Sequence, residues 1–242
     1  MMAAMEPERR VPGGSRTLLV ALAHPDDEVG CVGTIAAHRA RGDRVVLVWL
    51  TRGEMTDAFG RLSREEVARR RTEHGAQVGR MLGCEVRFLD FPDTRVEATA
   101  DAAHRMARLV AEVKPDAVVT WGEAWARGMR HPDHQATGKI VRDAVTLARI
   151  SAVVAPAAPH RANVPVFTLR EPPSLLPERA VDVSAHVEQV LEVARFYRER
   201  VGWPEEEWLL ARLREAGKRW GVEAAESFDA WETPGGLGPA LL

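Results

Sequence analysis

The chain has 242 residues, 45% of them hydrophobic, and a formal net charge of -2. A chain of this length can bury a substantial core, and its interspersed charges form no basic face for nucleic acid or for a membrane surface. The first fifteen residues lack a signal-like apolar segment, and no stretch approaches the ~20 apolar residues of a spanning helix. The two cysteines, Cys31 and Cys84, do not suggest a disulfide framework. We therefore expect a soluble cytoplasmic protein with no nucleic-acid or membrane partner.

Strands and helices alternate along most of the chain. The first apolar run, Thr17–Ala23, is nearly continuous, as expected of a strand that is covered on both faces, and a helix over Glu28–Arg41 follows it and ends at Gly42. A capping box at Ser63–Glu66 begins a helix that runs to Leu82. The other expected strands are Val45–Thr51, Val86–Leu89, Ala117–Trp121, Val164–Leu169 and Val181–Val183, and the other expected helices are Ala102–Val113, Asp133–Ile150, Ser184–Val201 and Glu205–Ala216.

This order of elements predicts an α/β fold of Rossmann-like type. Alternation of strands and helices favours a mainly parallel sheet sandwiched by helices, here followed by a helical C-terminal region. We expect a single catalytic domain over residues 16–232. Residues 1–15 are expected to form a disordered N-terminal tail and residues 233–242 a loose C-terminal tail, because both are rich in proline and glycine.

Two clusters of histidine and carboxylate follow apolar strands. His24-Pro25-Asp26-Asp27-Glu28 comes directly after the first strand, and His131-Pro132-Asp133-His134 precedes a helix more than a hundred residues later. Neutral imidazole and carboxylate oxygen are suitable ligands for a divalent ion such as zinc. Ligands gather outside the carboxyl ends of parallel strands, so the two loops can meet and supply three ligands with spare acid–base groups.

The first turn argues against a nucleotide site. Dinucleotide folds place G-x-G-x-x-G there so that backbone can approach a pyrophosphate, whereas carboxylates at this position would repel phosphate. Gly30 and Gly33 lie inside the expected helix, where we interpret them as close-packing glycines. No serine stands in a G-x-S-x-G context, which argues against a serine hydrolase.

The two motifs resemble those of the PIG-L/LmbE family of zinc-dependent N-deacetylases, which remove acetyl groups from amino sugars of the N-acetylglucosamine type. The order and approximate spacing match at Ala23–Glu28 and His131–His134. Weaker similarities are Thr51–Glu54 and the pair Arg70 and Glu73, and the resemblance extends from about residue 17 to 200. It implies an amide hydrolase that acts on a small-molecule amino sugar or sugar conjugate.

The resemblance also implies a role for each group of the two motifs. The metal ligands would be His24, Asp27 and His134, and Asp26 would be the base that takes a proton from a metal-bound water. His131 would bind the oxyanion or protonate the leaving amine, and Asp133 would hold His131 or a ligand imidazole in the required tautomer. Glu28 is expected to begin the helix, where the macrodipole favours a negative charge.

The resemblance also implies substrate contacts by Glu54, Arg70 and Asp93, which would hold the sugar hydroxyls or a group attached to the sugar. Arg70 also lies in a run of three arginines typical of a solvated helix face, and Asp93 follows a proline and could shape a turn.

Several alternatives stay open at this stage. Iron, cobalt or manganese could replace zinc, and a homo-oligomer is possible. The same chemistry would also hydrolyse another carbonyl bond such as an ester. A non-catalytic binding module stabilised by a metal is a third reading, although such a site gains nothing from an extra carboxylate and histidine.

Overall fold

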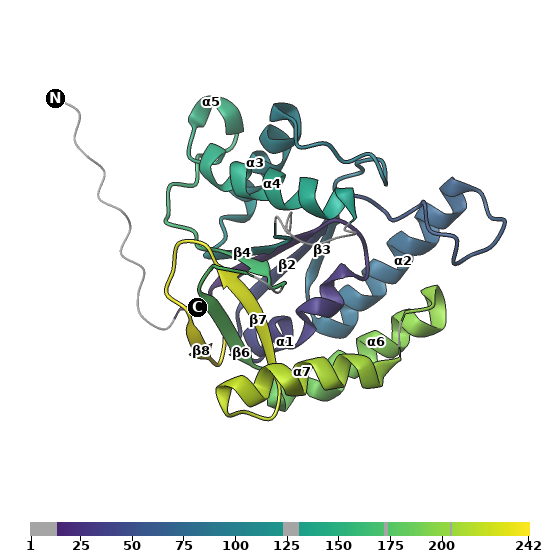
Figure 1. Cartoon of the computed structure of the whole chain (residues 1–242). Coiled ribbons are helices and arrows are strands. Elements are labelled where there is room, and N and C mark those ends of the chain that lie inside the picture. The colour runs from purple at the N-terminus through teal and green to yellow at the C-terminus, as the bar shows by residue number, and fades with distance from the viewer. Residues whose placement is uncertain (1–13, 123–130, 172–173, 204) are drawn as a thin grey trace.

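The computed structural model describes residues 14–122, 131–171, 174–203 and 205–242. The tail expected at residues 1–15 therefore lies outside the described residues, apart from its last two. Helices cover both faces of a central sheet (Figure 1), which is the predicted sandwich architecture.

Within these described residues the sheet has eight strands, in the order β3-β2-β1-β4-β5-β7-β6-β8. All neighbouring pairs run parallel except the two pairs that include β7, so β7 alone runs against the others. The predicted mainly parallel sheet is confirmed. The strands are β1 (Thr17–Leu22), β2 (Arg44–Trp49), β3 (Glu85–Phe88), β4 (Ala117–Thr120), β5 (Val166–Leu169), β6 (Glu178–Asp182), β7 (Ala225–Ala230) and β8 (Gly236–Gly238).

Two apolar layers separate the sheet from the helices. Around Trp49 and Phe228, one layer packs against α1 (Val32–Ala40), α2 (Arg64–Leu82), α6 (Val187–Val201) and α7 (Glu206–Trp220). On the opposite face, Met106 and Ile140 belong to a layer that packs against α3 (Ala100–Val113), α4 (Pro132–Leu147) and α5 (Ser151–Val154). Five of the six β1 residues are fully buried between these layers, as expected of a strand covered on both faces.

Local sequence patterns predicted both ends of α2 correctly. The side chain of Ser63 accepts a hydrogen bond from the Glu66 N–H at 3.2 Å, and Gly83 ends α2 with a φ of 65°. Gly33 is a close-packing glycine, because a Cβ there would lie 2.7 Å from Val183. The cysteines Cys31 and Cys84 are both free.

The segment after the first motif differs from the prediction of one helix over 28–41. A 3-10 turn, η1 (Asp27–Gly30), comes first, Cys31 then adopts a φ of -147°, and α1 begins only at Val32. The break separates the motif from α1, so residues 24–28 are not part of one continuous helix.

The C-terminal region also differs from the prediction. Strand β7 was not expected, because its buried positions include the charged residues Glu226 and Asp229 and so give no apolar run. Residues 233–242 are not a loose tail: β8 pairs with β6, and Ala240 and Leu241 are buried. The Leu241 N–H donates to His38 Nε2, whose Nδ1 lies 2.8 Å from Asp43. Burial lowers the pKa of His38, with Asp43 opposing and the nearby Arg41 and Arg16 acting in the same direction as burial.

Among the helices that the structure describes, none has the length and apolar content needed to cross a membrane.

Candidate active site

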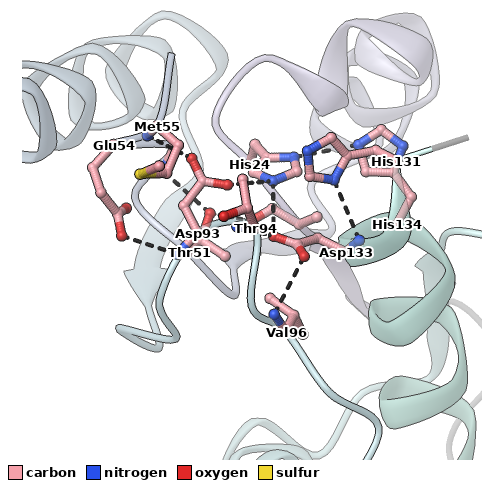
Figure 2. A network of polar contacts seen from close by, with 12 residues as sticks. His24, Thr51, Glu54, Met55, Asp93, Thr94, Val96, His131, Asp133 and His134 are labelled. Carbon is pink, nitrogen blue, oxygen red and sulfur yellow. Dashed lines mark hydrogen bonds and ion pairs between the residues drawn. The ribbon is translucent and has the colours of Figure 1, made fainter. Parts of the chain in front are cut away.

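Histidine and carboxylate side chains from distant segments meet at the carboxyl ends of the parallel strands (Figure 2). His24 follows β1, Asp93 follows β3, and His131 and His134 lie at the start of α4. The centre of the His24 ring lies 4.6 Å from that of His131 and 5.2 Å from that of His134. The two sequence motifs therefore form one cluster, as their positions after strands indicated.

The second motif is a helix start. His131 is the N-cap residue of α4, with its Nδ1 3.3 Å from the Asp133 N–H, and Pro132 occupies the first position, where its missing N–H costs nothing. The first turn of the helix then directs Asp133 and His134 toward His24 (Figure 2).

The three expected metal ligands lie close together. In a tetrahedral zinc site with ligand distances of about 2.0–2.1 Å, neighbouring donor atoms lie about 3.3 Å apart. His24 Nδ1 lies 3.3 Å from His134 Nε2, which lies 3.2 Å from Asp27 Oδ1. Asp27 Oδ2 lies 3.7 Å from His24 Nδ1. Asp27 thus meets the two histidines through different oxygens. The donor types suit a divalent ion such as zinc, and a ring nitrogen of His131 lies within 4.8 Å of those of the other two histidines.

The surroundings of Asp27 fix its direction. Its Oδ2 accepts hydrogen bonds from the N–H groups of Ala23 and His24 and from Trp121 Nε1, which leaves Oδ1 facing His134. The indole of Trp121 also stacks on the His134 ring, with 4.0 Å between the ring centres. Trp121 therefore holds two of the three candidate ligands, a role that its sequence context did not indicate.

The electrostatics of the cluster favour a positive charge. Burial lowers the pKa of His24, but hydrogen bonds to Asp133, Asp27 and Asp93 overcome this and raise it to about 12. Burial also opposes ionisation of Asp27, yet His134 and His24 hold its pKa well below the usual range. A bound cation would satisfy the same carboxylates that a proton on His24 satisfies.

Two further carboxylates orient His24. Asp133 is fully buried, accepts from the N–H groups of Thr94 and Val96, and places Oδ2 3.3 Å from His24 Nε2. Asp93 Oδ1 lies 3.1 Å from the same nitrogen. Of the two imidazoles that Asp133 was expected to hold, its carboxylate thus lies beside His24, a candidate ligand.

Asp26 has a strained backbone and a buried partner. Its φ is 108°, a left-handed conformation that non-glycine residues rarely adopt. Its Oδ2 accepts from Arg71 Nη2 at 2.9 Å, and Arg71 also donates to the Pro25 carbonyl. Burial raises the pKa of Asp26, Arg71 opposes the rise, and the adjacent Asp27 adds to it. A raised pKa suits a group that must take up a proton and pass it on.

Glu28 has a different role from the helix start that was predicted. It is fully buried and accepts from Tyr197 O–H at 2.6 Å, from Trp49 Nε1 at 3.0 Å and from the Asp26 N–H at 2.9 Å. The last bond holds the strained peptide of Asp26. Because Tyr197 lies 169 residues away in the chain, no local pattern could have revealed this anchor.

A cleft of about 360 Å³ opens over the cluster, and only one of the three expected substrate contacts is among the described residues that line it. Asp93 lines it, but Glu54 lies on the far side of Asp93 from the histidines and accepts from the Asp93 N–H (Figure 2). Arg70 is not among the lining residues; its Nε lies 3.3 Å from Glu66 on the outer side of α2. Arg71 lines the cleft instead. One step along a helix turns a side chain by about 100°, so only one of two adjacent arginines can face the site.

Fold and cluster together define an α/β protein with a candidate metal site at the carboxyl ends of a mainly parallel sheet. The chain belongs to the PIG-L family: the family model described as GlcNAc-PI de-N-acetylase matches residues 19–145. This confirms the family resemblance that the two motifs indicated.

Known proteins resemble most of the chain. A Bacillus anthracis protein named probable N-acetyl-alpha-D-glucosaminyl L-malate deacetylase 2 is 30% identical over 213 residues, covering 79% of this chain and 93% of that protein. The N,N'-diacetylchitobiose deacetylase of Pyrococcus horikoshii superposes with a TM-score of 0.79 at 23% identity, covering 90% and 84%. GalB, the 4-carboxy-2-hydroxymuconate hydratase of Pseudomonas putida, superposes with a TM-score of 0.77 at 21% identity. The match covers 92% of this chain and 100% of that chain. These two structures show the fold alone, and the second shows that the fold does not fix the reaction.

Proposed function

We propose that this protein is a metal-dependent hydrolase that removes an N-acetyl group from an amino sugar or a sugar conjugate. The observation that carries the proposal is the meeting of His24, His131 and His134, whose ring nitrogens lie within 4.8 Å of one another, with Asp27 in contact with His134 and Asp26 lining the same cleft. The deacetylase names of relatives such as the Bacillus anthracis protein support this choice of bond and substrate.

The proposed metal ligands are His24, Asp27 and His134, and zinc is the ion that we favour. When bound, such an ion polarises an acyl carbonyl and makes a nearby water more acidic. Asp26 would take the proton from that water through its carboxylate and deliver it to the departing amine. Arg71 would keep the Asp26 carboxylate directed into the cleft, since it binds one of its oxygens.

His131 and Asp93 would act on the substrate side of the cleft, which both of them line. His131 would donate a hydrogen bond to the oxyanion or a proton to the amine. Burial and the neighbouring His24 lower the pKa of His131, so proton donation would require the ring to gain its proton during the reaction. Asp93 and Arg71 are the proposed contacts of the sugar hydroxyls, and Asp133 would fix the tautomer of His24.

The test is acetate release from a panel of N-acetylglucosamine derivatives by the purified wild type and by Asp26→Asn, with bound metal quantified in both. We expect the wild type to release acetate and Asp26→Asn to keep its metal and lose turnover. Arg70→Gln is the matched control, because Arg70 lies outside the cleft, and it should behave as the wild type.

An ester hydrolase is the alternative within the same chemistry, because the same water would attack an ester carbonyl. Release of acid from acetyl esters without release from any N-acetyl sugar would favour the ester. A protein that binds no divalent metal would contradict both proposals.

A further inference from the structure

The loop after β2 holds Asp93 at two points (Figure 2). Glu54 Oε1 accepts a hydrogen bond from the Asp93 N–H at 2.9 Å. In return, Asp93 Oδ2 accepts from the Met55 N–H at 2.8 Å. Two adjacent residues of one loop therefore fix both the backbone and the side chain of Asp93, which lies on a different loop, after β3.

This arrangement directs the second oxygen of Asp93 at His24. The Asp93 side chain is 6% exposed, and its Oδ1 lies 3.1 Å from His24 Nε2. The other ring nitrogen, Nδ1, is the one that faces His134. A carboxylate on the outer nitrogen of a ligand histidine fixes the ring orientation and strengthens the ligand. Because a carboxylate offers about four acceptor positions, Asp93 can still receive a sugar hydroxyl.

The backbone next to Asp93 is strained and needs support. Thr94 has a φ of 67°, a left-handed conformation that β-branched residues rarely adopt. Such strain persists only where the surrounding structure holds it. Asp133 binds the N–H groups of Thr94 and Val96 on one side of Asp93, and Glu54 binds the N–H of Asp93 itself. Loss of the Glu54 bond would let this turn relax and Asp93 move away from His24.

The Glu54 carboxylate serves the backbone of Asp93 and not the cleft. Met55 and Asp93 are among the described residues that line the cleft, whereas Glu54 is not. Glu54 lies on the opposite side of Asp93 from the histidines (Figure 2). The family resemblance implied that Glu54 contacts the substrate directly, but its contacts indicate an indirect role.

We propose that Glu54 is a positioning residue of the metal site, which acts through Asp93 on His24. It holds the Asp93 carboxylate against His24 Nε2 and so strengthens metal binding by His24. This inference rests on the proposed function in one respect, because His24 is a proposed metal ligand. It gives Glu54 no contact with the substrate, so the loss of Glu54 should appear in metal affinity and not in KM.

The test measures the Kd for zinc of metal-free protein by competition with a chromophoric chelator. Glu54→Ala removes the acceptor, whereas Glu54→Gln removes the charge and keeps an oxygen that can accept from the Asp93 N–H. Glu97→Ala is the matched control, because Glu97 is exposed in the segment that follows Asp93. Melting temperatures of the metal-free proteins show that each variant is folded.

Glu54→Ala should weaken zinc binding about tenfold, the lower end of the effect of outer partners of metal ligands. Glu54→Asp, which keeps the charge but shortens the reach, should behave in the same way and replaces Glu54→Ala if that variant does not fold. Glu54→Gln should restore binding to within about twofold of the wild type, and Glu97→Ala should leave it unchanged. Equal losses in Glu54→Ala and Glu54→Gln, or no loss in either, would overturn the proposal.

A double mutant tests the route through Asp93. Asp93→Asn removes the charge that faces His24 and keeps the N–H that Glu54 binds, and it should weaken zinc binding by about 10–100-fold. Adding Glu54→Ala to Asp93→Asn should then cost less than about twofold, because the two residues act through one contact. Losses that simply add would show that Glu54 acts by another route and would overturn the proposal.

Turnover separates this proposal from the proposed function. At saturating zinc, Glu54→Ala should leave KM for N-acetylglucosamine derivatives unchanged. A raised KM with an unchanged Kd for zinc would make Glu54 a substrate contact and overturn the proposal. If the wild type binds zinc but releases no acetate, the proposed function fails, while the zinc affinities of the variants still decide the role of Glu54. A wild type that binds no zinc would overturn both.

Discussion

Replacing Tyr197 by phenylalanine tests the anchor of the first motif. The Tyr197 O–H donates to Glu28 Oε1 at 2.6 Å, and both side chains are fully buried. The substitution removes one hydrogen bond to a charged group and creates almost no cavity, so we expect a loss of about 1.5–3 kcal/mol. In a chain of this size 1 kcal/mol corresponds to about 2–4 °C, so a loss of about 2 kcal/mol lowers the Tm by about 4–8 °C.

The assay is thermal unfolding at pH 8.5 with turnover measured in parallel. Burial raises the pKa of Glu28 to about 7, against the lowering effect of Tyr197, so the higher pH favours the ionised carboxylate. Turnover should also fall, because Glu28 holds the backbone N–H of Asp26. Thr72→Val is the control: it deletes a hydroxyl that donates to the Ala68 carbonyl of the same helix, and it should change stability by less than about 0.5 kcal/mol. A Tm for Tyr197→Phe that equals the control would refute the anchor.

Three other variants test separate features. Gly138→Ala in α4 should destabilise the protein, although alanine normally gains about 1 kcal/mol over glycine in a helix, because its Cβ would clash with the backbone carbonyl of Trp121. A gain in stability on urea unfolding would contradict this packing. Arg71→Gln should lower turnover at least about tenfold, or about 1.4 kcal/mol of activation free energy, while Arg70→Gln changes it less than about twofold, and equal losses would show that Arg71 does not position the base. The lowered pKa of His38 means that the unfolded chain binds more protons below about pH 6.5, so stability is lost as pH falls through that range. The urea midpoint should therefore drop more between pH 7.5 and 5.5 in the wild type than in His38→Gln, and parallel drops would exclude this contribution.

Much of the fold followed from local patterns in the sequence. The apolar run Thr17–Leu22 predicted a buried strand from its composition alone. The ends of α2 at Ser63 and Gly83 depend on a local hydrogen bond and a local backbone conformation. Such signals depend on residues a few positions apart. Strand β7 carries no such signal, since its Glu226 is satisfied by the start of α1, some 190 residues earlier.

The sequence alone determined the chemistry of the candidate site. Two His/Asp motifs at the ends of apolar strands were enough to expect one cluster, because parallel strands deliver their carboxyl ends to the same edge of a sheet. Only the tertiary structure decided which neighbours serve that cluster. In the folded chain Arg71 rather than Arg70 binds Asp26, Trp121 donates to Asp27, and Tyr197 donates to Glu28. The reason is physical: residue type sets what a group can bind, but its partners across the fold depend on directions and distances that chain folding alone creates.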